Sequence, residues 1–143
     1  MTTQYWLVKS EPDAYSWETF LKDRRTSWDG VRNFQARNHL KGMKVGDAVF
    51  FYASVTGKAV LGVAEVSKAA YPDPTADEGE WVSVELKAKR TLSRPISLAE
   101  IKATPSLSKI ALLRQGRLSV VSVSEAEFEQ ILKLSESAPP AAK

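Results

Sequence analysis

The stretch WDGVRNFQARN, residues 28–38, holds the side chains in this sequence that are best suited to chemistry. Trp28 stands among polar residues, with Arg24 to Ser27 before it and the turn signal Asp29-Gly30 after it. We therefore expect an exposed indole whose face can stack on a planar ligand. Stacking of a nucleobase on an aromatic side chain contributes about 1–3 kcal/mol, so a base is a suitable ligand.

Short polar and basic side chains accompany this tryptophan. Those that could hydrogen-bond the edge of a base are Ser10, Asp29, Asn33 and Asn38. Those that could hold flanking phosphates are Lys9, Arg32 and Arg37. A simpler structure also fits, in which Asp29-Gly30 is only a turn and Asn33 and Arg37 only cap helices. The residues alone leave a ligand site and a capped turn equally open.

The sequence lacks the residue sets that most enzymes use. It has no cysteine and one histidine, which argues against thiol nucleophiles, disulfides and transition-metal sites. No serine has a glycine elbow around it, so we expect His39 to be an exposed or capping imidazole. Neither GxxxxGK[ST] nor GxGxxG occurs, and the acids of residues 73–80 fit a solvated loop. We predict a non-catalytic protein without catalytic residues, metal or cofactor.

The positive charges are concentrated in two blocks. Residues 22–44 contain seven Lys or Arg against two Asp, and residues 86–117 contain eight against one Glu. Between them, residues 71–85 contain five acids and no base. Two such blocks could form an anion-binding face, but charge alone favours a merely solvated surface.

The composition is that of one globular domain. The chain has 143 residues, of which 43% are hydrophobic and 26% charged. No run of 18 apolar residues occurs, and the N-terminal residues lack the apolar region of a signal peptide. We expect a cytoplasmic protein, or a nuclear one if its source is eukaryotic, with no membrane partner and a monomeric state.

Hydrophobic patterns predict five strands and several short helices. The strands are expected at residues 5–9, 48–54, 59–66, 82–91 and 118–123, with Gly62 at a bulge or close approach. Helices are expected after the N-caps Ser16, Asn33, Ser97 and Ser124, the last two in capping boxes. Because no βαβ alternation is present, we predict an α+β fold, a small mixed barrel or curled sheet.

Several segments together resemble the EVE domain family. They are YWLVKSEP (5–12), YSW (15–17), WDGVRNFQARN (28–38), GDAVFFY (46–52), GVAEV (62–66), AYPDPTA (70–76), RPISLAEIK (94–102) and RLSV (117–120). The resemblance covers nearly all of residues 4–134. It implies a PUA-like small mixed β-barrel of about five or six strands with short peripheral helices, related to YTH and PUA modules. We therefore expect the domain to span residues 1–134. The tail SESAPPAAK, residues 135–143, contains Pro, Ala and Ser without periodicity, so we expect it to be disordered.

The resemblance also implies a site: an aromatic pocket for a modified base, beside a basic surface. Carried over residue by residue, the pocket comprises Lys9, Ser10, Glu11, Trp28, Asp29, Gly30, Val31, Arg32, Asn33, Arg37, Asn38, Tyr52, Ser54, Arg117 and Ser119. The chain departs from many members at Ala53, where they have His. The implied partner is DNA or RNA, with a modified cytosine as the favoured base. The alternatives are a sensor of a free nucleoside in the same pocket and, less favoured, an enzyme acting on nucleic acid.

Overall fold

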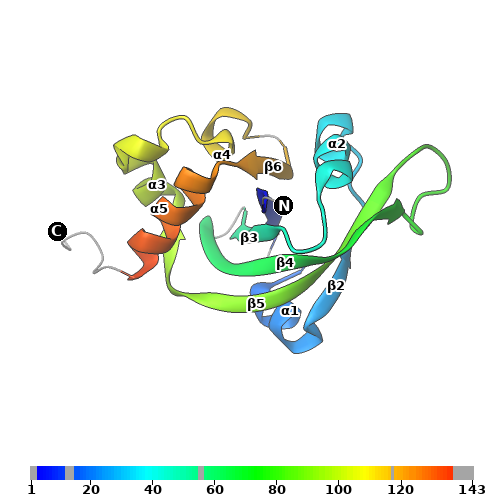
Figure 1. The fold of residues 1–143 in the computed structure, drawn as a ribbon, viewed down its shortest axis with the longest axis horizontal. Coiled ribbons are helices and arrows are strands. Elements are labelled where there is room, and N and C mark those ends of the chain that lie inside the picture. Colours follow the sequence, from blue (N-terminus) through cyan, green and yellow to red (C-terminus); the bar gives the residue numbers. More distant parts are fainter. Residues whose placement is uncertain (1–2, 12–14, 55–56, 117, 137–143) are drawn as a thin grey trace.

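A single mixed sheet forms the centre of the molecule (Figure 1). The computed structural model describes residues 3–11, 15–54, 57–116 and 118–136. The strands are β1 (Tyr5–Ser10), β2 (Arg25–Trp28), β3 (Ala48–Ala53), β4 (Ala59–Pro72), β5 (Val82–Ser97) and β6 (Val120–Val123). The six strands run in the order β2-β5-β4-β3-β1-β6, and β1 pairs with β3 in parallel while the other pairs are antiparallel. β2 and β6 lie at opposite edges, so the predicted α+β mixed sheet is confirmed, and its curvature is barrel-like without closure.

Short helices flank the sheet. They are α1 (Trp17–Asp23), α2 (Phe34–Gly42), α3 (Leu98–Ala103), the 3-10 turn η1 (Pro105–Leu107), α4 (Ala111–Arg114) and α5 (Glu125–Glu136). Ser16, Asn33 and Ser97 cap their helices, each accepting a hydrogen bond from a backbone N–H three residues on. The capping box predicted at Ser97 is only half formed, because the Glu100 carboxylate binds Arg94 instead of the Ser97 N–H. Ser124 and Glu127 form a complete capping box, with reciprocal bonds of 3.0 and 3.1 Å. No helix in the described ranges is long and apolar enough to cross a membrane.

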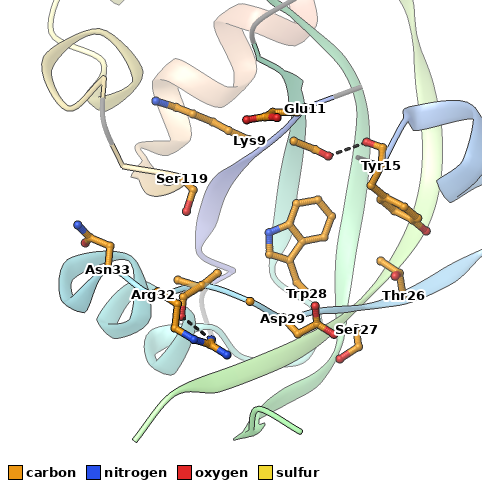
Figure 2. Close-up of a pocket in the computed structure, with 13 residues that line it drawn as sticks. Lys9, Glu11, Tyr15, Thr26, Ser27, Trp28, Asp29, Arg32, Asn33 and Ser119 are labelled. Atoms are coloured by element: carbon orange, nitrogen blue, oxygen red, sulfur yellow. Dashed lines mark hydrogen bonds between the residues drawn. The ribbon is translucent and has the colours of Figure 1, made fainter. Parts of the chain in front are cut away.

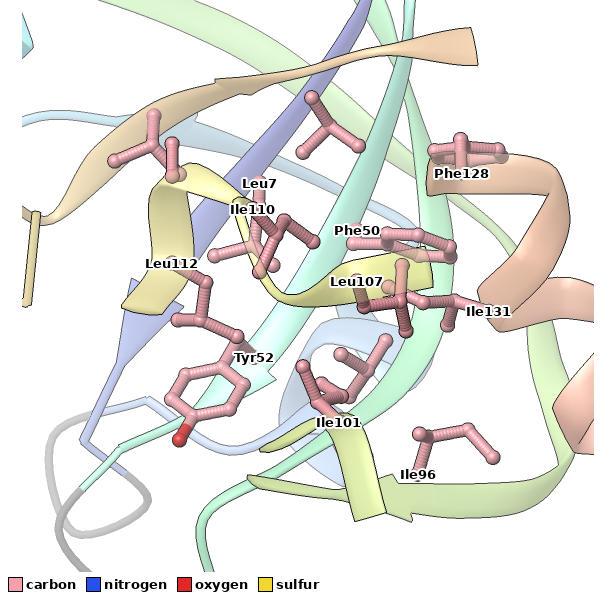
Figure 3. Packing of buried hydrophobic residues seen from close by; sticks show 14 of the residues in the cluster. Leu7, Phe50, Tyr52, Ile96, Ile101, Leu107, Ile110, Leu112, Phe128 and Ile131 are labelled. Carbon is pink, nitrogen blue, oxygen red and sulfur yellow. The ribbon is translucent and has the colours of Figure 1, made fainter. Parts of the chain in front are cut away.

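The core has two parts, one on each face of the sheet. On β1, Leu7 faces one part, whereas Trp6 and Val8 face the other, as strand alternation predicts. The first part packs under α3, α4 and α5, and Figure 3 shows Phe50 beside Phe128, with ring centroids 3.9 Å apart. The second part contains Trp17, Phe20 and Trp28 and is the part that reaches the candidate site.

Gly62 permits a close approach, as its position in a strand predicted. A Cβ there would lie 2.1 Å from the indole of Trp17, so only glycine lets this ring pack on β4. The indole N–H of Trp17 then donates to Thr91 Oγ1 at 2.9 Å. This contact fixes α1 against the sheet, and β2 follows α1 directly in the chain.

The structure contains strand residues that the sequence patterns missed. β2 was not predicted, because RTSW is short and polar and is held as an edge strand by pairing with β5, with Thr26 opposite Leu86. β4 and β5 extend beyond their predicted ends at residues 66 and 91, because their outer parts are exposed and lack a regular apolar alternation. α5 continues through Glu136, two residues past the expected domain boundary, and residues 137–143 lie outside the described residues.

Candidate functional site

A pocket of about 540 Å³ opens where the ends of β1 and β2 meet residues 29–33 (Figure 2). This volume lies in the range of sites that hold small molecules. The predicted residues that line it are Lys9, Ser10, Glu11, Trp28, Asp29, Gly30, Val31, Arg32, Asn33 and Ser119. Tyr15, Thr26 and Ser27 also line it and were not predicted. Thr26 and Ser27 belong to β2, so missing that strand also hid their place in the pocket.

Trp28 is a fixed wall of this pocket. Its exposed fraction is 9%, and its ring makes edge-on contacts with Tyr15 and Phe51, with centroids 6.3 and 5.9 Å apart. The expectation of an exposed indole was therefore wrong. Trp28 is the last residue of β2 and pairs with buried Val84, which places it in the core despite its polar neighbours in sequence. The ring is therefore held in place by its neighbours.

The indole N–H of Trp28 is unused. Trp6 donates its indole N–H to Asp47 at 3.0 Å and Trp17 donates to Thr91 at 2.9 Å, as buried indoles usually do. No described residue accepts a hydrogen bond from the indole of Trp28. In Figure 2 its nitrogen lies on the side of the ring nearer Ser119. The pocket therefore offers one directed donor beside a flat aromatic wall.

A buried carboxylate, Asp73, holds the segment that follows Trp28. Asp73 is 5% exposed and accepts hydrogen bonds from the backbone N–H of Gly30 at 2.8 Å and from Arg32 at 2.9 Å. Thr75 adds its backbone N–H at 2.7 Å and its hydroxyl at 2.6 Å. The expectation of a solvated acidic loop was wrong at this residue. The Asp-x-Thr spacing of Asp73 and Thr75 is typical of an Asx turn, and this local pattern could have indicated that the Asp73 carboxylate accepts hydrogen bonds.

The electrostatics of Asp73 follow from these bonds. Burial by itself would raise the pKa of the Asp73 carboxyl. The hydrogen bonds from Thr75, Arg32 and Gly30 outweigh that effect and hold the pKa well below its usual range. Asp73 is therefore ionised at neutral pH and offsets the charge of Arg32.

Both cations of the pocket lining are already engaged. The Arg32 guanidinium donates hydrogen bonds to Asp73, to the Val31 carbonyl at 3.1 Å and to Thr75 at 3.2 Å. The Lys9 ammonium donates to the Gly116 carbonyl at 2.9 Å, and burial lowers the pKa of Lys9. Glu11 and Asp29 line the same pocket, so the two basic groups of the described lining are matched by two acidic groups. Among the described residues, the lining is balanced in charge rather than basic.

A sequence model of the EVE domain matches residues 4–134. The chain belongs to the EVE domain family. Thymocyte nuclear protein 1 of Homo sapiens is 32% identical, over 96% of this chain and 76% of the relative's length. A solved protein of Agrobacterium tumefaciens is 40% identical with a TM-score of 0.91, covering 96% of this chain and 97% of that one.

Two solved complexes have the same fold. Human THYN1, in a complex with DNA containing 5-methylcytosine, is 32% identical with a TM-score of 0.88, covering 96% of this chain and all of that one (100%). The YTH domain of Zygosaccharomyces rouxii MRB1, in a complex with N6-methyladenosine RNA, is 17% identical with a TM-score of 0.59, covering 99% of this chain and 89% of that one. At that identity the YTH domain is similar in fold alone. The family and the PUA-like architecture inferred from the sequence are thus confirmed.

The backbone of this EVE domain explains why Ser10 and Ser119 meet at the pocket. The Lys9 N–H donates to the Ser119 carbonyl at 2.9 Å, which brings the chain before β6 beside the end of β1. The Ser10 hydroxyl donates to the Tyr15 carbonyl at 2.6 Å. Ser10 therefore positions Tyr15, and its hydroxyl hydrogen is not free for a ligand.

Asn33 has a divided role in the EVE domain. Its side-chain oxygen accepts the Ala36 N–H at 3.0 Å and caps α2, which leaves its amide N–H groups available to the pocket. Gly30 lies three residues before Asn33 and has a φ of 77°, a conformation that favours glycine. Its backbone N–H donates a hydrogen bond to Asp73. The capped turn expected from the residues alone is therefore also part of the pocket lining.

Four of the predicted residues lie elsewhere. Tyr52 and Ser54 line a second pocket of about 320 Å³, and of the first pocket's lining only Lys9 reaches it among the described residues. Tyr52 is 4% exposed and belongs to the opposite part of the core. Arg37 and Asn38 lie on α2 outside the pocket lining. Arg117 lies outside the described residues.

His39 also lies away from the pocket lining. It was expected to be exposed or capping, but it is half-buried, with its ring edge-on to Trp6 at a centroid distance of 5.8 Å. Burial lowers the pKa of this imidazole. In the described ranges, no group of three or more His, Asp or Glu side chains is placed to hold a metal ion.

The two basic blocks adjoin across β2 and β5, where Arg25 is opposite Lys87. The second block is partly neutralised within the sheet. Lys87 and Lys89 lie 3.7 and 3.5 Å from Glu65. Arg94 forms a two-bond pair with Glu100, each bond 2.8 Å long. The basic surface is therefore smaller than the count of Lys and Arg implied.

Proposed function

We propose that the pocket around Trp28 binds a modified nucleobase of DNA or RNA, most suitably a modified cytosine, without catalysing a reaction on it. One observation carries the proposal. The cavity of about 540 Å³ has an indole wall with an unused N–H, and it lies in a chain of the family whose human member THYN1 was solved with DNA containing 5-methylcytosine.

Binding requires the base to leave its stack, which costs a few kcal/mol and less in a single strand. Trp28 supplies a flat wall already held by Tyr15 and Phe51, so this ring does not have to be ordered on binding. Its indole N–H and the side-chain amide of Asn33 are free donors for acceptors on the base edge. These groups suit a base, which presents ring nitrogens and carbonyl oxygens at its edge.

Recognition of a modification falls to Val31. It is 7% exposed and is the one aliphatic side chain among the lining residues that the structure describes. A methyl group against such a wall contributes only about 1–3 kcal/mol of discrimination. We therefore expect a moderate preference for a methylated base.

The non-catalytic part of the proposal rests on the lining. The single histidine of the chain is not part of it, and the Ser10 hydroxyl is bonded to a backbone carbonyl. The lining thus supplies surfaces and hydrogen-bonding groups rather than a nucleophile beside a base. Turnover of an oligonucleotide by the pure protein, lost on Asp29→Asn, would contradict this part.

A sensor of free nucleosides is the second candidate. The balanced charge of the described lining residues favours it, because Lys9 and Arg32 are matched by Glu11 and Asp29 and both cations already have partners. A ligand without phosphates would meet no charge excess there.

A salt titration separates the two candidates. The affinity for a single-stranded oligonucleotide with one 5-methylcytosine, and for 5-methylcytidine alone, would be measured from 50 to 300 mM salt. We expect strand binding to weaken with salt as counterions are released, and nucleoside binding to stay constant. Strand affinity that equals nucleoside affinity at every salt concentration would favour the sensor.

A further inference from the structure

An exposed aromatic cluster lies beside the pocket, outside both parts of the core. Phe34 is 65% exposed, and its ring stacks on that of Trp81 at a centroid distance of 5.1 Å and an angle of 21°. Neither ring belongs to the buried clusters. Arg37 lies over both rings. We call Phe34, Trp81 and Arg37 together the aromatic platform.

Arg37 gives the platform a charge without a carboxylate partner. Its guanidinium carbon lies 5.0 Å from the centroid of Phe34 and 5.8 Å from that of Trp81. Its only hydrogen bonds within the described residues go to the neutral side-chain oxygen of Asn38, at 3.4 and 3.2 Å. Arg32, by contrast, is paired with Asp73. The charge of Arg37 is therefore available to a phosphate.

The platform is continuous with the pocket. Phe34 follows Asn33, which lines the pocket, and Arg32 both lines the pocket and lies 5.6 Å over the ring of Trp81. The platform is also held in place. A Cβ at Gly79 would lie 2.8 Å from the Trp81 indole nitrogen, so a glycine lets this ring fold against the hairpin turn.

We propose that the platform stacks the base next to the one in the pocket and that Arg37 binds the phosphate between them. This rests on the proposed function of the pocket, and it makes the ligand a strand rather than a free nucleoside. Single exposed apolar side chains are common and need no function. Phe34 differs because it extends a fixed aromatic surface, beside an unpaired cation, from the mouth of a base-sized pocket. Proteins that bind single strands combine these two features.

The test compares a nucleoside with a strand. 5-Methylcytidine and a single-stranded trinucleotide with a central 5-methylcytosine would be titrated against the whole chain and against Phe34→Ala. We expect Phe34→Ala to weaken trinucleotide binding about tenfold and to leave nucleoside binding unchanged. Phe34→Leu keeps an apolar contact with Trp81 without an aromatic face, and we expect the same loss. Val45→Ala, which changes an equally exposed side chain outside the pocket lining, serves as the control.

Arg37→Gln tests the phosphate contact. It should lower trinucleotide affinity and reduce the slope of log affinity against log salt by about 0.7, the value for one phosphate on a single strand. Trinucleotide affinity unchanged in Phe34→Ala and Phe34→Leu would overturn the platform, as would an equal loss for the nucleoside. Trp28→Phe distinguishes this failure from failure of the pocket. Trp28→Phe should weaken the binding of both the nucleoside and the trinucleotide. If the affinity for neither ligand changed, the proposed function itself would be overturned.

Discussion

The backbone N–H of Gly30 donates to the Asp73 carboxylate at 2.8 Å, across 43 residues of sequence. This bond joins the segment after β2 to the hairpin between β4 and β5. Arg32 donates to the same oxygen at 2.9 Å, so one carboxylate fixes two residues of the pocket wall. The shape of the pocket therefore depends on a residue that does not line it.

Replacing Asp73 by Asn should lower the free energy of unfolding by about 2 kcal/mol. Hydrogen bonds to a buried charged group contribute about 1.5–3 kcal/mol, and asparagine removes that charge while adding donors that face Gly30 and Arg32. Urea denaturation followed by circular dichroism measures the change. Asp77→Asn alters an exposed acid of the same hairpin and should stay within about 0.5 kcal/mol of the wild type. Equal stability of the two variants would contradict the role given to Asp73.

The stability contribution of Asp73 should depend on pH in one direction. Its folded pKa lies below the unfolded value of about 3.9. The contribution is therefore fully present above the unfolded pKa and is lost as pH falls through the folded pKa. The difference in unfolding free energy between wild type and Asp73→Asn should be constant from about pH 6 to 8 and should narrow below about pH 4. A difference that instead grows on acidification would show that folding does not lower the pKa of Asp73.

Trp28 should matter to stability as well as to binding. Because it is 9% exposed and contacts Phe51, Trp28→Ala should cost about 3–5 kcal/mol. Trp28→Phe keeps an aromatic ring and should cost clearly less, which makes it the better variant for binding studies. Thermal and chemical denaturation of both variants provide the measurement. An alanine variant as stable as the wild type would mean that the indole is not part of the core.

Val31 should set the preference for a methylated base. Val31→Ala removes apolar wall, so the ratio of affinities for 5-methylcytosine and cytosine strands should fall by roughly fivefold, or about 1 kcal/mol. Titrations of wild type and variant with both strands test this. Thr26→Ser removes one methyl group from the lining, where Val31→Ala removes two, and serves as the control. If Thr26→Ser abolished the preference and Val31→Ala did not, the methyl group of the base would have to lie against β2 instead.

Local patterns predicted what depends on neighbours in sequence. The strand predicted at residues 5–9 implies, by simple alternation, that Leu7 faces one side of the sheet and Trp6 and Val8 the other, as the structure has them. Asn33 was likewise predicted as the cap of α2. The pocket residues near Trp28 came from motifs that resemble a family, because the residues alone also fitted a simple turn.

The rest depends on contacts between distant segments. Trp28 was misplaced because its burial comes from Tyr15, Phe51 and the pairing of β2 with β5. Asp73 was missed because its partner Gly30 approaches it only in the folded chain. Tyr52 lines a second pocket rather than the pocket around Trp28, because its side chain lies in the opposite part of the core.

The central claim, that a modified base binds against Trp28, is tested most directly by its indole N–H. The sequence has four tryptophans, so a ¹⁵N-labelled sample gives few indole signals, and Trp28→Phe identifies the one from Trp28. On titration with a 5-methylcytosine strand, we predict a large shift of the Trp28 signal. The signals of Trp6 and Trp17, bonded to Asp47 and Thr91, should hardly move. A Trp28 signal that stays in place when the protein is saturated with the strand would contradict the account.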